Sequence, residues 1–445
     1  MSALSTAPAT IVKVLESINS QSVSGFFSSF TDDAILTDEG KDYTGKTEIE
    51  KWFLDSLAGH NASIEVKKVT DLSTNVVVHV LMDGDFEADF GLVDPFDLYF
   101  SFFLANNAVK SLSITDWDSA NPTMNAVWIS KGLPEDPVGS IHISKRPQVE
   151  APEGWIKVKM EAAGLNFHDV FTLRGAEMTG LTFPRIIGCE GAGTLEDGSK
   201  VLLFPAMGDP DWKGDETLDP ARNVFSEAID GTLAEYVIAP ARNVLPRPDA
   251  LDVISASVLG VAWLTAYRML FTKSGLKAGQ IMLVQGASGG VATALIQLGS
   301  AAGMRVWSVG RTEKKRALGL RLGAERVFAP GEELPEKADS VFDTSGAATF
   351  AHSVDSCKVG GTIVTCGGHS GMNVTVDLML LVVNQISVHG NYLGTLEEFR
   401  DLITFVVAKG IKPHVGLVVP LEEARTGFQR MVDGRTDGKI VVTMG

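Results

Sequence analysis

The stretch IMLVQGASGGVATALIQLGSAAG, residues 281–303, decides the fold of the larger part of this 445-residue chain. An apolar strand, Ile281 to Val284, is followed by a turn of small residues from Gly286 to Ala292 and by an apolar helix. Small residues let the backbone approach a diphosphate, which the amide groups at the start of the next helix can bind. The stretch therefore predicts a dinucleotide site. The alternative is a turn with a purely structural role.

The segment after the next strand distinguishes between the two nicotinamide dinucleotides. An NAD site would have an acidic residue about twenty positions beyond the turn, to hold the ribose 2′-hydroxyl. Here residues 309–315 read VGRTEKK, and Gly310 leaves room where the carboxylate would lie. Arg311, with Lys314 or Lys315, has the charge to bind a 2′-phosphate. The segment predicts NADP as the cofactor, and a solvated helix start with ordinary lysines is the alternative.

Acidic residues are concentrated at the start of the chain. Residues 1–123 carry a net charge of -12, whereas the remaining 322 residues carry -5. Glycine changes at the same position, with six before residue 124 and 39 after it. The two compositions predict two modules. The total charge of -17 argues against nucleic acid or an anionic membrane as a partner.

The cysteines and the first residues indicate a compartment. Cys189, Cys357 and Cys366 are too few and too far apart for a disulfide framework, which favours a reducing environment. The first residues lack the basic segment and apolar core of a secretion signal, and no apolar run is long enough to span a bilayer. We therefore expect a cytoplasmic protein.

The region before residue 118 is predicted to be an α+β cone. Apolar residues at helical spacing predict helices over 11–18 and 47–57, and strands at 63–69, 75–81, 98–104 and 109–117 favour an antiparallel sheet. Helices followed by a run of strands are typical of an α+β fold. Residues 118–123 have the composition of a linker.

The predicted secondary structure of residues 124–445 changes along the chain. Short strands broken by glycine and proline predict a β-rich domain from residue 124 to about 253, with a long polar loop at 207–230. Strands and helices then alternate to about residue 389, which predicts a doubly wound parallel sheet of the Rossmann type. A capping box at Thr395 and Glu398 predicts the start of a further helix, which ends at Gly410.

Residues 124–445 resemble the zinc-independent medium-chain dehydrogenase/reductases, the branch of quinone oxidoreductases and zinc-type alcohol dehydrogenase-like proteins. The segments that carry the resemblance, besides the glycine turn, are AAGLNFHDVFTLRG (162–175), IIGCEGAG (186–193), GTLAEYVIAP (231–240), LGVAWLTAYRMLF (259–271), VGGTIVTCGG (359–368) and GKIVV (438–442). The resemblance implies a GroES-like catalytic domain made of 124–253 and 390–445, a Rossmann domain at 254–389, and a cofactor in the cleft between them.

The resemblance also implies which residues contact the cofactor. They are Gly286, Ser288, Gly289, Gly290 and Val291 of the turn, Gly310, Arg311 and Lys315 after the second strand, and Asn166, Thr265, Gly367, Gly368, Asn391 and Lys439 from elsewhere in the chain.

Metal binding can be judged from the same positions. In zinc-containing relatives the positions of Asn166 and Cys189 hold a cysteine and a histidine, respectively. Asn166 cannot supply a thiolate. Cys189 and the nearby His168 are zinc ligands by type, but a catalytic zinc requires three protein ligands, and we identify no third. We therefore expect no metal.

Without a metal, the resemblance implies hydride transfer from the nicotinamide to the electrophilic carbon of an enone, an enoyl compound or a quinone. The enolate oxygen that develops needs a hydrogen-bond donor, and Asn166 is the leading candidate. His168 or Asp169 is a candidate to relay a proton, and Tyr267 to donate one, although each of the three also fits a structural role.

The first 117 residues resemble the SnoaL-like family of nuclear-transport-factor-like cones. The resemblance is carried by FTDDAILTDEGKDYTGKTEIEKWF (30–53) and by the phenylalanine-rich segment 83–117. The fold is shared by isomerases, cyclases, dehydratases and dimerisation modules. Its acids could be bases in a pocket, where burial would raise their pKa, but surface carboxylates are the favoured interpretation. These acids are Asp38, Glu39, Asp83 and Asp85.

Together these observations favour an NADPH-dependent oxidoreductase that reduces an activated C=C bond or a quinone in a small molecule, and that forms a homodimer. One alternative is an alcohol or carbonyl oxidoreductase. Another is an isomerase or cyclase whose chemistry lies in the cone domain. A third is a protein that senses the nucleotide without catalysis.

Overall fold

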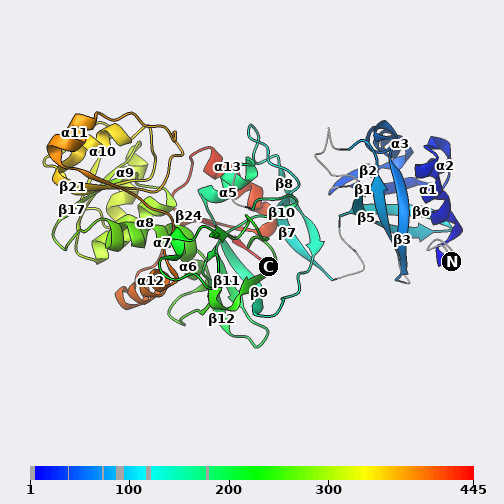
Figure 1. Cartoon of the computed structure of the whole chain (residues 1–445), viewed down its shortest axis with the longest axis horizontal. Helices are drawn as coiled ribbons and strands as arrows, with labels where there is room; N and C mark the ends of the chain where they lie inside the picture. Colours follow the sequence, from blue (N-terminus) through cyan, green and yellow to red (C-terminus); the bar gives the residue numbers. More distant parts are fainter. Residues whose placement is uncertain (1–5, 39, 73–74, 87–94, 117–121, 177–179) are drawn as a thin grey trace. The chain divides into compact units, whose positions relative to one another are not determined.

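The computed structural model describes residues 6–38, 40–72, 75–86, 95–116, 122–176 and 180–445, so most of the predicted linker lies outside it. The chain divides into two compact units, residues 1–125 with 144–148, and residues 126–143 with 149–445 (Figure 1). Ser144–Gln148, predicted to lie in the β-rich domain, group with the first unit instead. The reason is local bonding: Arg146 donates to Asp116, and the Gln148 N–H donates to the Pro122 carbonyl.

In the part of the chain that the structure describes, the first unit has one mixed sheet and three α-helices. The helices are α1 (Ala9–Asn19), α2 (Val23–Phe27) and α3 (Gly45–Ser56). The strands are β1 (Phe30–Asp38), β2 (Lys41–Thr44), β3 (Ser63–Asp71), β4 (Val76–Asp83), β5 (Phe96–Ala105) and β6 (Ala108–Thr115), in the order β2-β1-β6-β5-β4-β3. The core contains the apolar face of α1 and the aromatic residues of α3 and β5, namely Ile11, Val14, Leu15, Ile18, Trp52, Phe53, Phe100 and Phe102.

Two strands of this sheet, β1 and β2, were not evident in the sequence pattern. β1 pairs in parallel with β6, so the sheet is mixed, and the prediction of an antiparallel sheet is wrong on this side. β1 exposes Asp32 and Asp33 in succession, and its register on β6 shifts between Phe30 and Ile35. The apolar alternation is therefore interrupted where the pairing changes. The assignment of this unit as a cone stays a prediction.

The second unit contains a seven-stranded sheet built around one long central strand. The order is β16 (Val244–Pro246), β12 (Lys200–Leu203), β11 (Gly191–Thr194), β9 (Trp155–Leu165), β24 (Lys439–Thr443) and β23 (Val415–Pro420), with β15 (Tyr236–Pro240) also paired to β9. A smaller sheet has the order β10 (Arg185–Ile186), β7 (Thr123–Ile129) and β8 (Ile141–Pro147). The predicted polar loop contains the short pair β13 (Ala206–Met207) and β14 (Asn223–Val224) and the single 3-10 turn η3 (Glu216–Leu218).

A six-stranded parallel sheet forms the remaining part of this unit. Its order is β19 (Arg326–Phe328), β18 (Arg305–Val309), β17 (Ile281–Gln285), β20 (Ala338–Asp343), β21 (Cys357–Thr365) and β22 (Ser387–Gly390). Met282 and Val284 of β17 are buried in the same core as α8 (Gly290–Ala301), whereas Ile281 and Leu283 are buried with α10 (Phe350–Ser356). Both faces are covered, so the prediction of a doubly wound sheet is confirmed.

The other helices follow from local signals. α12 (Leu396–Lys409) begins at the predicted capping box and ends at Gly410, whose φ of 61° favours glycine. α9 (Glu313–Arg321) is capped by Thr312. α5 (Phe167–Leu173), α6 (Val253–Ala256), α7 (Leu264–Tyr267), α11 (Leu378–Asn384) and α13 (Ala424–Val432) complete the set, and π-helical turns flank α7. Among the described residues, none of these helices is long and apolar enough to cross a membrane.

Candidate active site

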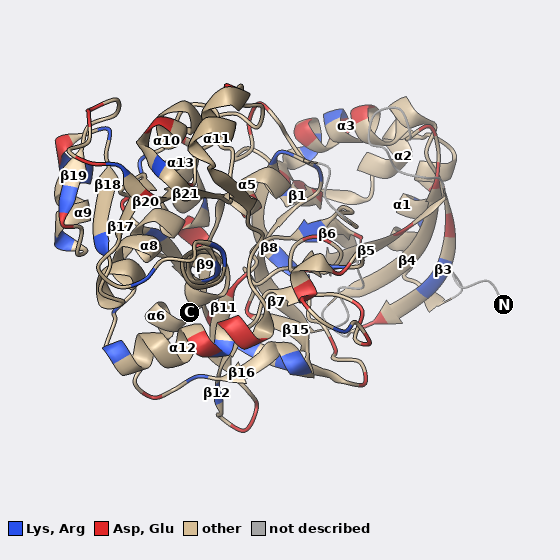
Figure 2. Ribbon diagram, turned by 60° about the vertical axis from the view of Figure 1, so that its left-hand side comes forward, with Lys and Arg blue, Asp and Glu red and all other residues tan. Residues whose placement is uncertain are grey.

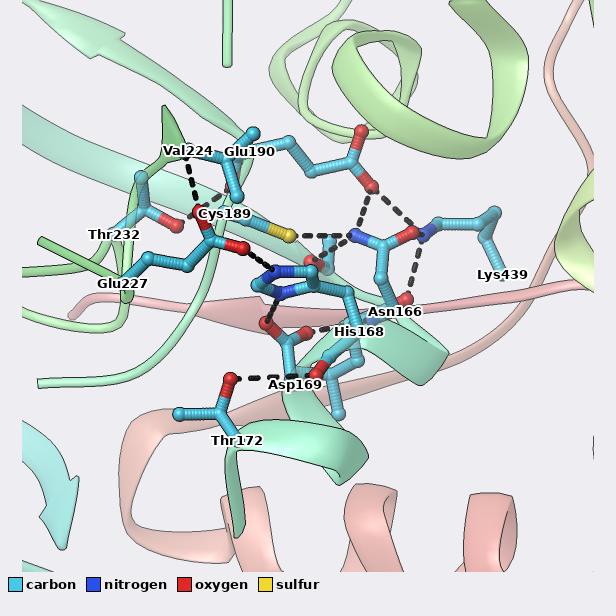
Figure 3. Close-up of polar contacts among 12 residues, drawn as sticks. Asn166, His168, Asp169, Thr172, Cys189, Glu190, Val224, Glu227, Thr232 and Lys439 are labelled. Atoms are coloured by element: carbon cyan, nitrogen blue, oxygen red, sulfur yellow. Dashed lines mark hydrogen bonds and ion pairs between the residues drawn. The ribbon is translucent and has the colours of Figure 1, made fainter. Parts of the chain in front are cut away.

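A buried polar network lies where β9 ends and α5 begins (Figure 3). β24 runs antiparallel to β9 with Ile440 opposite Leu165, and this register places Lys439 beside Asn166. β11 pairs with the other side of β9, and Glu190 comes immediately before β11. Three separate parts of the sequence therefore supply charged or amide groups to one point of the sheet.

Lys439 is the cation at the centre of this network. Its Nζ lies 2.7 Å from Glu190 Oε1 and donates to Asn166 Oδ1 (2.6 Å) and to the Leu165 carbonyl. Glu190 Oε2 accepts from the Val261 N–H at 2.7 Å. Lys439 is 2% exposed and Glu190 is fully buried, so each charge depends on the other.

Asn166 has both ends of its side-chain amide engaged. Its Nδ2 donates to Glu190 Oε1 (2.8 Å) and to the Gly164 carbonyl (3.2 Å), while Lys439 donates to its oxygen. The predicted donation from Asn166 to a substrate oxygen would have to replace one of these bonds. In this arrangement Asn166 orients Lys439 and Glu190 instead.

His168 and Asp169 lie on the first turn of α5, next to Cys189. His168 Nε2 donates to Glu227 Oε1 at 3.0 Å, and Glu227 Oε2 accepts from the Val224 N–H at 3.0 Å. Asp169 Oδ2 accepts from the Asn166 N–H at 2.7 Å. His168 Nδ1 and Asp169 Oδ1 lie 4.0 Å apart, and neither has a hydrogen-bond partner among the described residues.

The surroundings of this cluster favour positive charge. Burial opposes protonation of the imidazole, but Cys189, Asp169 and Glu227 around it together raise the pKa of His168 well above its ordinary value. Burial raises the pKa of the Cys189 thiol to about 12, and the negative charge of Asp169 adds to that effect. At neutral pH the imidazole of His168 therefore keeps its proton, and the Cys189 thiol, protonated at its ordinary pKa, stays so.

The predicted glycine turn lies against this network. α8 begins at Gly290, and a Cβ added there would come within 2.9 Å of Lys439 Cδ. The Gly438 N–H donates to the Ser288 carbonyl at 2.8 Å, next to the start of β24. Gly286 has a φ of 139°, which favours glycine. The turn residues Gly289 and Val291 stand on either side of Gly290, so the predicted phosphate-binding amides and the polar network are neighbours.

A basic pocket lies at the start of α9 and has a volume of about 930 Å³. Arg311, Lys314 and Lys315, the residues expected to bind a 2′-phosphate, line it, and Figure 2 shows this helix rich in cations. Lys315 donates to the Gly434 carbonyl at 3.2 Å, and Lys314 pairs with Asp437. Three further cations that sequence reasoning missed also line the pocket: Arg425, Arg430 and Arg435.

Two family models match the second unit. "Alcohol dehydrogenase GroES-like domain" matches residues 152–249, and "Zinc-binding dehydrogenase" matches residues 290–408. Over these two ranges, and over most of the second unit, the chain is similar to the medium-chain dehydrogenase/reductases. The β-rich part is therefore the GroES-like domain, and the parallel sheet is the Rossmann-type domain.

Relatives in this family are oxidoreductases with different substrates. An alcohol dehydrogenase of Geobacillus stearothermophilus is 29% identical over 324 residues, 67% of this chain and 94% of the relative. The acryloyl-coenzyme A reductase of Sulfurisphaera tokodaii is 27% identical over 64% and 91% of the two chains. The mouse quinone oxidoreductase is 26% identical over 65% and 89%. A solved NAD-dependent alcohol dehydrogenase is 28% identical, with a TM-score of 0.67 over 72% of this chain and all of its own.

The remaining predicted cofactor residues lie on the Rossmann-type domain and beside it. Gly367 and Gly368 follow β21, and Asn391 follows β22, at the carboxyl edge of the sheet where ligands of such sheets bind. The Asn391 N–H donates to the Thr365 carbonyl, while its buried Oδ1 has no partner among the described residues. Thr265 is buried in α7, which packs on α8. The Gly310 N–H donates to the Phe328 carbonyl at 2.9 Å.

The two tyrosines near the site have different surroundings. The Tyr267 ring packs on Phe271 with centroids 4.6 Å apart, and burial, with the charges of Asp401 and Glu398, raises the pKa of its phenol. The charged residues near Tyr267 therefore lie in α12, and Tyr267 is not part of the Asn166 network. Tyr392, which sequence reasoning missed although it follows Asn391, has the Arg222 guanidinium 5.4 Å from its ring. Burial, and then the charge of Glu227, raise the pKa of the Tyr392 phenol.

The acids considered in the first unit do not form a buried group. Asp38 accepts from Trp52 Nε1 at 2.9 Å. Asp83 and Asp85 are exposed, and Asp85 accepts from Asn61 at 2.6 Å. Glu39 lies outside the described residues. The described acids therefore agree with the interpretation as surface carboxylates.

The ligands of zinc-containing relatives do not fit here. Asn166 has no thiolate, and its amide is taken up by Lys439 and Glu190. The expectation of no metal rested, however, on the lack of a third ligand beside His168 and Cys189. That premise is wrong, because Asp169 offers one: the ligand atoms of the three residues lie within 4.8 Å of one another.

Replacing the central cation tests the buried network. Lys439→Met leaves the Glu190 carboxylate buried without its counter-ion, and we expect a loss of about 3 kcal/mol of stability, seen as a lower temperature of thermal unfolding. Lys439→Met/Glu190→Gln should recover more than half of that loss, because the neutral amide needs no counter-ion. Lys314→Met, which removes an exposed ion pair, should change stability by less than about 0.5 kcal/mol. Equal melting temperatures for Lys439→Met and the unmodified protein would contradict the assignment.

Proposed function

We propose that the chain is an NADPH-dependent oxidoreductase that transfers a hydride to an activated C=C bond of an enone or enoyl compound, or to a quinone, without zinc in the hydride step. The observation that carries the proposal is the basic pocket beside the glycine turn. Six cations, and Asp437 as the one carboxylate, line it in a chain whose net charge is -17. A local excess of cations in an acidic protein favours an anionic ligand such as a 2′-phosphate.

The choice of substrate rests on the absence of a thiolate at position 166. The relatives named for acryloyl-coenzyme A and quinone act on substrates in which a conjugated acceptor needs no metal to become electrophilic. Asn166 and Glu190 instead hold the buried ammonium of Lys439 near the glycine turn. This arrangement favours reduction of a conjugated acceptor over oxidation of an alcohol.

The residues of the site have distinct parts in this reaction. Bound NADPH supplies the hydride. Asn166 and Glu190 orient Lys439, and Lys439 lies against the turn that would hold the diphosphate. Tyr392 replaces Tyr267 as our candidate donor to the enolate oxygen, because its phenol lies in the charge surroundings of His168 and Glu227 and stays protonated.

Deuterium transfer tests the reaction class. The full chain is incubated with NADPH deuterated at C4, in each of the two stereochemical forms, and with a simple enone, an enoyl thioester or a quinone. We expect one form to place deuterium on the β-carbon of the enone or thioester, detected by NMR and mass spectrometry. Deuterium on a carbinol carbon would support the alternative of a carbonyl oxidoreductase. Absence of NADPH oxidation with every acceptor would overturn the proposal.

Removal of Arg311 tests the cofactor preference. No carboxylate of the described residues pairs with its guanidinium, so it is available to a phosphate. Arg311→Ala should weaken NADPH binding by about 2 kcal/mol, or roughly 30-fold, while NADH binding changes little. Lys314→Ala is the matched control, because Lys314 is already paired with Asp437 and should have a smaller effect. Equal loss for both dinucleotides would defeat the 2′-phosphate assignment.

For the first unit we propose a SnoaL-like module with an accessory role. Support comes from the mixed six-stranded sheet with helices packed on it, and from the sequence segments that resemble the family. The exposed positions of Asp83 and Asp85 give no support to the alternative of an isomerase or cyclase in this unit.

We further propose that two copies of the chain associate through β22 and α11. β22 is an edge strand with all four residues exposed, and α11 has no buried residue. α11 carries no charge, as its uniform tan colour in Figure 2 shows. Pairing of β22 with its copy would cover both the free edge and the exposed apolar side chains Leu378, Met379, Leu380, Val382, Val383 and Val388.

A charge on this surface tests the homodimer. Val383 is 65% exposed, so Val383→Glu should leave the fold intact but place two carboxylates in the interface. We expect light scattering after size exclusion to give twice the chain mass of 47.5 kDa for the unmodified protein and 47.5 kDa for the variant. Leu218→Glu, at an equally exposed position of the polar loop, should remain dimeric. A single-chain mass for the unmodified protein would refute the proposal.

A further inference from the structure

We propose that His168 Nδ1, Asp169 Oδ1 and Cys189 Sγ form a site for one divalent metal ion of the zinc type. The three atoms lie within 4.8 Å of one another, and the first two are 4.0 Å apart. The ligand set differs from that of zinc-containing relatives, because two ligands come from α5 and the position of their thiolate is Asn166. The site goes beyond the proposed function, since hydride transfer to a conjugated acceptor does not require it.

The hydrogen bonds around the cluster prepare these atoms for a cation. Glu227 accepts from His168 Nε2, so it is Nδ1 that would lose its proton on metal binding and present its lone pair to the cluster. The Asn166 N–H occupies Asp169 Oδ2 and leaves Oδ1 open. His168 Nδ1 and Asp169 Oδ1 thus face each other at 4.0 Å, and neither has a hydrogen-bond partner among the described residues. In the absence of a metal, the protons held by His168 and Cys189 offset the negative charge here, and a divalent ion would displace them.

The charges of the surroundings favour the cation. Asp169, Glu190 and Glu227 are three buried carboxylates, whereas Lys439 is the one buried ammonium in the same network. Glu227 on His168 Nε2 also provides the carboxylate–histidine pair that commonly orients a metal-binding imidazole. His168, when protonated, is the other cation of this network. A divalent ion that displaces the protons of His168 and Cys189 would carry the same total charge as those two protons, so the network can accept it without a change in net charge.

The donor types select the class of metal. One sulfur, one nitrogen and one oxygen suit zinc or cobalt, whereas magnesium and calcium require oxygen ligands throughout. Zinc bonds of about 2.0 to 2.3 Å place ligand atoms of a tetrahedral site roughly 3.3 to 3.8 Å apart. The ligand atoms, which lie within 4.8 Å of one another, would have to approach by up to about 1 Å to reach that spacing. His168 and Asp169 would then be ligands, and no longer candidates for a proton relay.

Cobalt spectroscopy of the full chain tests the site without reference to activity. Protein purified without a polyhistidine tag is treated with a chelator, dialysed, and titrated with Co²⁺ in the absence of NADPH. We expect one equivalent of Co²⁺ to produce a thiolate-to-cobalt charge-transfer band and the visible bands of a tetrahedral ion. Elemental analysis should show up to one equivalent of zinc in the same protein after reconstitution with Zn²⁺.

Single substitutions assign the ligands. Cys189→Ala should abolish the charge-transfer band, and Asp169→Asn and His168→Gln should each weaken Co²⁺ binding at least tenfold. Cys366→Ala is the matched control, because Cys366 is also a thiol whose pKa burial raises to about 12, yet it lies outside the cluster. That variant should bind Co²⁺ as the unmodified protein does.

The proposal fails if the unmodified protein gives no charge-transfer band at saturating Co²⁺, which would mean that a water or a proton occupies the cluster. It also fails if Cys189→Ala retains the band while folded by circular dichroism. If Cys189→Ala does not fold, the unmodified protein and Cys366→Ala still decide: a band in both supports the site, and loss of the band in Cys366→Ala refutes it.

Discussion

The ion pair between Lys439 and Glu190 is the interaction on which the site depends. An ammonium and a carboxylate are both removed from water here, so neither is stable unless the other is held within bonding distance. That requirement fixes the register of β24 on β9 and of β11 on the other side of β9. Because Lys439 also lies against Gly290, the same pair determines where the start of α8 meets the GroES-like domain.

The same interaction explains why position 166 is an asparagine. The amide accepts from Lys439 through its oxygen and donates to Glu190 through its nitrogen, so it satisfies both members of the pair at once. A thiolate at this position would add a third charge and could not donate to Glu190. The network thus holds an ammonium as its fixed cation at the place where zinc-containing relatives hold a ligand of the metal. Loss of the thiolate and presence of the buried lysine are two parts of one electrostatic arrangement.

Local signals in the sequence were enough to predict most of the Rossmann-type domain. The turn at 286–292, the cap at Thr395 and the ending at Gly410 are all properties of a few neighbouring residues. β1 of the first unit was not predictable in this way, because its two exposed aspartates interrupt the alternation and its partner β6 lies some seventy residues later. The mixed sheet arises from a long-range pairing that no local pattern records.

The same distinction divides the functional residues. Arg311 and Lys315 could be predicted because they follow the glycine turn at a set spacing, and they do line the basic pocket. Arg425, Arg430 and Arg435 could not, because they reach the pocket from α13 and the turn after it, over a hundred residues later. Nor could the roles of Asn166 and Tyr267 be read from their neighbours, since the partners of each are supplied by other elements.

The cluster of His168, Asp169 and Cys189 depends on one backbone conformation. Gly188 has a φ of 100°, and a Cβ there would come within 2.8 Å of Leu233 Cγ. Only glycine accommodates both constraints, and the turn it permits directs Cys189 toward the first turn of α5. His168 and Asp169 face the sulfur because Asn166 caps that helix and its N–H holds Asp169. A glycine on one segment and a helix cap on another thus bring together a thiol, an imidazole and a carboxylate that are about twenty residues apart in the sequence.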